Sequence, residues 1–132
     1  MTDKIPSMRS PLGKTRGLGS AKTGTEHWNL QRLTAYALIP LTLYCLVGFL
    51  DKAVSGGYIG AMYWLQSPFS ATFTIMMLLT GLRHSTLGLQ VVIEDYCHNH
   101  ASKTALLFIV HYIALALAIL GTLSVAKIFF GV

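Results

Sequence analysis

Three long apolar runs dominate the pattern of residues along the chain: Leu33–Leu50, Ala71–Ile93, which has polar interruptions, and Ala105–Ala126. Each run approaches the roughly 20 residues that an α-helix needs to cross the hydrocarbon of a bilayer. The alternation of apolar and polar residues that is typical of membrane barrel strands is missing from this sequence. The pattern therefore predicts an all-α integral membrane protein with three transmembrane helices, at about 30–51, 68–95 and 104–127.

Composition agrees with this prediction. Of the 132 residues, 53% are hydrophobic and only 11% are charged, whereas soluble domains usually carry about 25% charged residues. A chain of this size could not bury so much apolar side chain in one aqueous core. Residence in a membrane follows, with lipid as one of the surroundings.

Charge predicts the orientation and the division of the chain. A basic stretch precedes the first run and holds Lys4, Arg9, Lys14, Arg16 and Lys22. Because short basic flanks stay on the cytoplasmic side, we expect the N-terminus and the loop at 94–103 inside and the C-terminus outside. We divide the chain into a basic cytoplasmic N-terminal arm, 1–28, and a three-helix transmembrane anchor domain, 29–132.

The expected location is the inner (cytoplasmic) membrane, with several crossings. Asp3 and Glu26 make the arm a poor mitochondrial transit peptide, so the mitochondrial inner membrane is the weaker alternative. Gly56 and Gly57 are expected to break the chain after the first crossing. The aromatic residues that follow, Tyr58, Tyr63 and Trp64, suit the outer headgroup level.

His84 is the most unusual residue of the second run. It lies 12 residues before Tyr96, hence about 18 Å deeper along a helix, and ionisable residues at such depth usually face a site or the inside of a bundle. Gly81 and Gly88 lie about 60° and 40° from it on a helix, so we expect a surface free of side chains that suits a flat cofactor. Haem ligation and a hydrogen bond to a neighbouring helix both remain open.

The second run is followed by three polar residues, Glu94, Asp95 and Tyr96, which end the predicted helix. Carboxylates at the C-terminal end of a helix oppose its macrodipole, at a cost of a few tenths to about 1 kcal/mol. A tyrosine hydroxyl beside an aspartate could bind a carbonyl ligand and take part in proton delivery. An interfacial tyrosine next to a solvated carboxylate is the alternative.

These residues resemble a known family. The combination of His84, Gly88, Gln90-Val91-Val92 and Asp95-Tyr96 is similar to the second helix of the small membrane-anchor subunits of succinate dehydrogenase, respiratory complex II. Upstream, the first helix of that family resembles the stretch QRLTAYALIPLTLYCLVGF. The likeness extends from about Trp28 to Val132 and includes all three runs in order.

The resemblance implies a set of roles. His84 would be one axial ligand of the iron of haem b, and a companion cytochrome b anchor subunit would supply the other within a heterodimeric anchor bundle. Tyr96 would donate a hydrogen bond to ubiquinone, and Asp95 would support that pocket and proton uptake. Arg32 would lie near a haem propionate or the quinone pocket, or else act only as a cytoplasmic anchor. Arg83 would pair with a propionate or reach to the interface.

The resemblance also implies partners and a division of labour. Succinate would be oxidised on a flavoprotein subunit, and electrons would pass through an iron–sulfur subunit to ubiquinone, linking the tricarboxylic acid cycle to electron transport. This chain, which carries no catalytic dyad, phosphate loop or thiol motif, would be a non-catalytic anchor. No nucleic-acid partner is expected.

The sequence also allows rival interpretations of the function. A fumarate reductase anchor has similar parts, and a haem-free membrane scaffold needs none of them. A self-sufficient di-haem cytochrome needs more paired histidines than the chain offers. His111 lies at a different depth from His84 and is expected to be a packing residue, while His27, at the mouth of the first helix, could reach a propionate.

Overall fold

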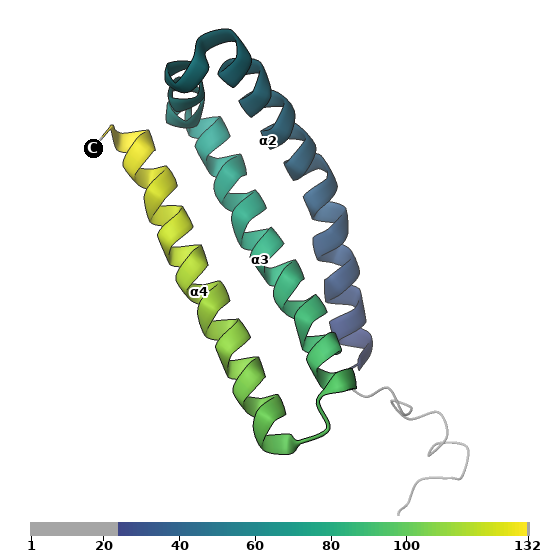
Figure 1. The fold of residues 1–132 in the computed structure, drawn as a ribbon. Coiled ribbons are helices and arrows are strands. Elements are labelled where there is room, and N and C mark those ends of the chain that lie inside the picture. The colour runs from purple at the N-terminus through teal and green to yellow at the C-terminus, as the bar shows by residue number, and fades with distance from the viewer. Residues whose placement is uncertain (1–23, 132) are drawn as a thin grey trace, which may run out of the picture.

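The computed structural model describes residues 24–131, which form three helices: α2 (Gly24–Gln66), α3 (Pro68–Tyr96) and α4 (His100–Phe130) (Figure 1). The predicted all-helical architecture is confirmed for these residues. The predicted crossings at 30–51, 68–95 and 104–127 fall within α2, α3 and α4. The basic arm predicted for 1–28 lies outside the described residues except for 24–28, which begin α2.

Helix α2 changes direction at one residue. Gly57 has φ 58° and ψ −146°, a combination open to glycine and strained for any residue with a Cβ atom. The helical segment after Gly57 therefore turns back at the top of Figure 1 and leads into α3. The predicted break is confirmed at Gly57, whereas Gly56 remains helical.

The ends of α3 and α4 follow ordinary capping chemistry. Pro68 stands in the first turn of α3, where the N–H that proline lacks has no helical partner to lose. At the start of α4, the side chain of Asn99 accepts a hydrogen bond from the backbone N–H of Ala101 at 2.9 Å. Gly131 ends α4 in the left-handed conformation, the usual glycine cap.

The three helices lie side by side in one layer, with α3 between α2 and α4 (Figure 1). Successive helices run antiparallel, so the start of α2, the end of α3 and the start of α4 share one end of the molecule. Such a thin layer buries little of itself, and Leu87, at 2% exposure, is its one fully buried large side chain among the described residues. Most of the apolar surface is therefore left for lipid or other subunits.

Two of the described helices, α2 and α4, are long and apolar enough to cross a membrane. The most apolar stretch of α4 has none of its residues buried inside the structure, unlike a core helix of a soluble protein. Helix α3 is long enough, but Arg83, His84, Glu94 and Asp95 lower its mean hydropathy. Membrane residence is thus supported by α2 and α4.

Aromatic rings join the helices at the Gly57 end. The ring of Tyr44 on α2 lies 4.7 Å from that of Phe73 and 6.2 Å from that of Phe69 on α3, centroid to centroid. Trp64, beyond the turn, lies 6.0 Å from Tyr44 and 6.2 Å from Phe49. We call these five residues the aromatic cluster. Trp64, expected at the headgroup level, packs back onto α2.

Helices α3 and α4 approach closely at a glycine. A Cβ atom added at Gly121 would collide with the Leu78 side chain of α3. Ala114 and Ala118, which precede Gly121 on the same face, are half-buried, whereas Ala116 is exposed. Small residues therefore allow α4 to pack closely on one face.

We expect Gly121→Val to destabilise the anchor, because the new side chain requires the space of Leu78. Overpacking of this kind costs about 1–3 kcal/mol, which should lower the melting temperature of the purified complex. Leu78→Ala in the same chain should restore part of the loss. Gly56→Val is the control, since nothing lies within 4 Å of a Cβ atom at Gly56. Equal stability of the Gly121 variant and wild type would contradict the packing described here.

Candidate functional site

Helix α2 presents a row of polar side chains to α3. His27, Gln31 and Thr34 recur at intervals of four and three residues, so they lie on one face of the helix. We call these three residues the polar stripe. Thr34 is buried at 8% exposure. His27 Nε2 and Gln31 Oε1 are buried and have no hydrogen-bond partner within residues 24–131.

His84 meets this stripe from α3. Its Nδ1 atom lies 3.0 Å from Thr34 Oγ1. The same hydroxyl lies 2.9 Å from the carbonyl oxygen of Leu30 and 3.0 Å from that of Gln31, both in the preceding turn of α2. One side of the imidazole is therefore tied to α2.

The other ring nitrogen of His84, Nε2, has different surroundings from Nδ1. Nε2 makes no hydrogen bond to any described residue, and it is not among the buried atoms that lack partners. The side chain as a whole is half-buried. His84 therefore has one ring nitrogen hydrogen-bonded to α2 and one that is neither buried nor bonded to a described residue.

The glycines near His84 correct one expectation. A Cβ atom at Gly81 would lie 3.8 Å from Leu38 Cδ2, and one at Gly88 would lie 3.5 Å from Gln31 Nε2. Both glycines thus face α2 and allow it to approach, rather than leaving a surface free of side chains for a cofactor. The reason is that His84, whose face they share, itself points at α2.

These pairs also give the register of the two helices. Three pairs define this register: Leu38 faces Gly81, Thr34 faces His84, and Gln31 faces Gly88. Residue numbers fall along α2 as they rise along α3, as in any antiparallel pair of helices. Continued further, the same register places the start of α2 beside the last turn of α3, which carries Asp95 and Tyr96.

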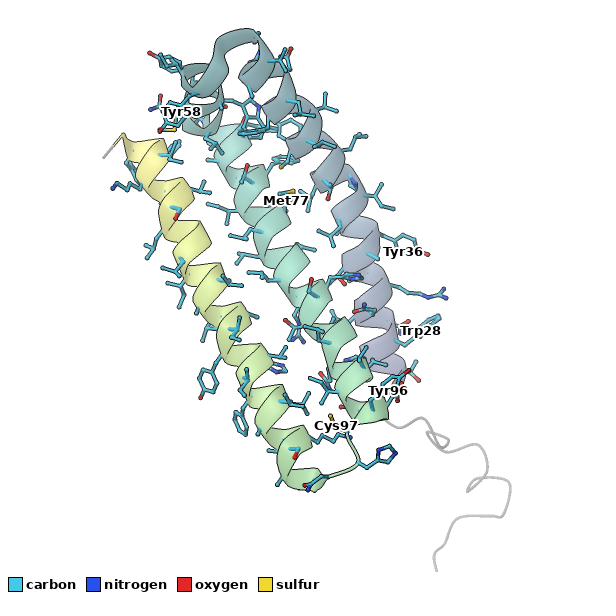
Figure 2. The ribbon with its side chains drawn as sticks, in the orientation of Figure 1. Trp28, Tyr36, Tyr58, Met77, Tyr96 and Cys97 are labelled. Carbon is cyan, nitrogen blue, oxygen red and sulfur yellow. The ribbon has the colours of Figure 1, made fainter. Side chains whose placement is uncertain are left out.

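Asp95 and Tyr96 are exposed at that end, Tyr96 with 79% of its surface. Figure 2 shows Tyr96 at the end of the molecule where Trp28 and the start of α2 lie. Glu94, in the same turn, accepts a hydrogen bond from Gln90 Nε2 at 2.9 Å. A pocket that includes Tyr96 would thus need walls from another subunit.

Arg32 is not brought to His84. Its guanidinium carbon lies 4.0 Å from the centroid of the Trp28 ring, a cation–π contact. Trp28, Arg32, Leu33 and Tyr36 are among the residues that line a shallow hollow on this outer face of α2. Since Arg32 follows Gln31 directly, it points about 100° away from the polar stripe.

Two other basic residues of the membrane region are also separate from the site. His111 is exposed on α4, and its Nδ1 atom is 2.8 Å from the carbonyl oxygen of Leu107. Arg83 is exposed on α3. Within residues 24–131, no three His, Cys, Asp or Glu side chains gather as they would around a metal ion bound directly by protein. Haem iron takes axial ligands singly and needs no such cluster.

Thr34 and Gln31 were not identified from the sequence as site residues. Threonine is common in apolar helices, so Thr34 does not stand out by residue type. Gln31 lies among other polar residues at the start of α2. The available signal was their spacing with His27, which puts three polar side chains on one face of an otherwise apolar helix.

Comparison with known proteins gives a consistent result. The family described as succinate dehydrogenase/fumarate reductase transmembrane subunit matches residues 6–125. The chain is 34% identical to the succinate dehydrogenase hydrophobic membrane anchor subunit of Rickettsia bellii (strain RML369-C), over 77% of this chain and 81% of that protein.

Other relatives carry similar names. The succinate dehydrogenase hydrophobic membrane anchor subunit of Paracoccus denitrificans is 30% identical over 75% of this chain and 76% of its own length. The succinate dehydrogenase membrane anchor subunit of Reclinomonas americana is 32% identical over 71% of this chain and 80% of its own length. No solved structure matches the chain significantly.

Proposed function

Because the chain belongs to the succinate dehydrogenase hydrophobic membrane anchor subunits, we propose that α3 supplies one axial ligand of haem b and part of a ubiquinone site. Succinate is then oxidised on a flavoprotein subunit, and electrons reach the membrane through an iron–sulfur subunit. The family model includes fumarate reductases, and a fumarate reductase anchor would carry electrons in the reverse direction. The names of the relatives favour succinate oxidation.

The accessible Nε2 atom of His84 carries the proposal. Axial histidines bind haem iron through a neutral ring nitrogen while the other nitrogen is hydrogen-bonded to protein. His84 has this arrangement, with Nδ1 at Thr34 and Nε2 without a partner among the described residues. The chain's own residues therefore fit a haem, with His84 as its ligand to the iron. When bound, haem b supplies a one-electron store close to the quinone.

Tyr96 and Asp95 fit the proposed ubiquinone site at the shared end of α2 and α3. The Tyr96 hydroxyl can donate a hydrogen bond to a quinone carbonyl, and the Asp95 carboxylate can hold a proton that the reduced quinone needs. Arg32, exposed beside Trp28 near this end, is proposed to contact the quinone pocket or a haem propionate.

The thin layer leaves large exposed faces that the proposed partners would cover. We propose that a companion cytochrome b anchor subunit covers one face, supplies the second axial ligand and completes the quinone pocket. Lipid would cover most of the remaining apolar surface. The iron–sulfur subunit would dock at the end that carries Tyr96, because electrons must arrive near the quinone, and the flavoprotein subunit would sit behind it.

We further propose that α3 is a third crossing and that the N-terminus is cytoplasmic. Helix α3 lies between two helices apolar enough to span, so its polar residues can face protein rather than lipid. The basic residues before α2 are consistent with this orientation. The membrane would be the inner membrane of a bacterium.

The orientation predicts which residues are reached from each side. In a chain without its native cysteines, we expect Tyr58→Cys to react with a membrane-impermeant maleimide on intact spheroplasts, since Tyr58 is 78% exposed beyond the Gly57 turn. His98→Cys, in the loop between α3 and α4, should react only after the membrane is opened. Labelling of His98→Cys alone in intact cells would reverse the orientation.

The haem assignment is tested by the dithionite-reduced minus oxidised spectrum of the complex purified through this chain. We expect a b-type absorbance band. An intact complex without such a band would overturn the haem proposal and leave at most a haem-free anchor.

A further inference from the structure

We propose that Thr34 is a positioning residue for His84: its hydroxyl accepts the Nδ1–H of the imidazole and so leaves Nε2 as the iron-binding nitrogen. The inference rests on the proposed haem ligation and adds a residue from another helix to it.

The direction of the hydrogen bond follows from the surroundings of Thr34. Its hydroxyl oxygen lies 2.9 Å from the carbonyl oxygen of Leu30 and 3.0 Å from that of Gln31. Oxygen atoms this close repel one another unless a proton lies between them, and a hydroxyl has only one proton to give. The Thr34 proton therefore points to these carbonyls, and a lone pair of Oγ1 faces His84.

The proton between Thr34 and His84 must then belong to the imidazole. At 3.0 Å between Oγ1 and Nδ1, His84 donates and Thr34 accepts. A neutral imidazole carries one N–H, so a proton on Nδ1 leaves a lone pair on Nε2. Thr34 thus selects the tautomer that can bind a metal through Nε2.

Burial makes this selection hard to replace. Thr34 is 8% exposed, so water has little access to the position of its hydroxyl. The pair also joins α2 to α3, which holds the imidazole plane against the rigid backbone of α2. An outer hydrogen bond of this kind raises the basicity of a ligating histidine, which favours the oxidised iron and lowers its reduction potential.

The test compares Thr34→Val with Thr34→Ser in the whole complex. Valine keeps the shape of threonine but cannot accept the Nδ1–H, so we expect a raised haem midpoint potential, altered low-spin EPR g-values and about ten-fold weaker retention of haem. Serine keeps the hydroxyl and should behave as wild type.

Thr86→Val is the matched control. Thr86 is also buried, but its hydroxyl bonds to the carbonyl oxygen of Leu82 at 2.6 Å and makes no hydrogen bond to an imidazole of the described residues. We expect an unchanged midpoint potential for this variant. If Thr34→Val does not assemble, Thr34→Ala, which also lacks the acceptor and adds no bulk, takes its place.

The outcomes separate this inference from the proposed function. If the b-type band depends on His84 but Thr34→Val or Thr34→Ala leaves its potential and g-values unchanged, the inference is overturned and the haem ligation stands. A Thr34→Ser potential as high as that of the valine or alanine variant would also overturn it, because packing rather than the hydroxyl would be the cause. If the band does not depend on His84, the proposed ligation itself fails.

Discussion

Replacing His84 by alanine is expected to abolish or shift the b-type band of the purified complex, with haem-to-flavin ratios at least about ten-fold below wild type. Losing a residue that only orients a metal ligand typically costs 10- to 100-fold in affinity, and removing the ligand itself should cost no less. The reduced minus oxidised spectrum and the bound flavin are measured on the same sample, so incomplete assembly is recognised at once.

His111→Ala is the control for this experiment. His111 is also a histidine of the apolar region, but it is exposed on α4 and its Nδ1 atom donates to Leu107 of its own helix. Its substitution should leave the band in place. A band that survives in His84→Ala and disappears in His111→Ala would move the ligand to α4 and refute the site described here.

Tyr96→Phe is expected to lower the kcat/KM for ubiquinone by about ten-fold or more. The change removes only the hydroxyl, and leaving a ligand carbonyl without its hydrogen bond costs about 1–3 kcal/mol, where 1.4 kcal/mol is a factor of ten. Succinate-driven reduction of a short-chain ubiquinone is compared with reduction of a dye that takes electrons from the soluble subunits. The dye reaction should be unaffected.

Tyr58→Phe provides the comparison, since Tyr58 is 78% exposed and Tyr96 is 79% exposed, but Tyr58 lies at the opposite end (Figure 2). It should leave both reactions unchanged. Full quinone activity in Tyr96→Phe would mean that this tyrosine is only an interfacial residue, the alternative that the sequence left open.

Much of the architecture could be predicted because it depends on properties local to the chain. Apolar runs of sufficient length predict helices. Glycine is the residue type that tolerates the backbone conformation seen at Gly57, so the turn after the first run was predictable. The separation of His84 and Tyr96 along α3 also follows from their spacing on a single helix.

The contacts of His84 could not be predicted in the same way. Its hydrogen bond to Thr34 joins residues 50 positions apart and depends on the antiparallel register and rotation of two helices, which no local pattern specifies. The same rotation decided the role of Gly81 and Gly88, which face α2 and allow it to approach. For Arg32, a shift of one residue from Gln31 was enough to turn the side chain to the outer face.

The aromatic cluster makes the two ends of the α2–α3 pair different. At the Gly57 end, a chain of ring contacts joins the first part of α2 to α3 and to the part of α2 beyond the turn. Toward the opposite end, the same two helices meet at His27 and Gln31, each with a buried polar atom lacking a described partner. Packed aromatic rings therefore join one end of the α2–α3 pair, and polar side chains with unpaired buried atoms among the described residues join the other.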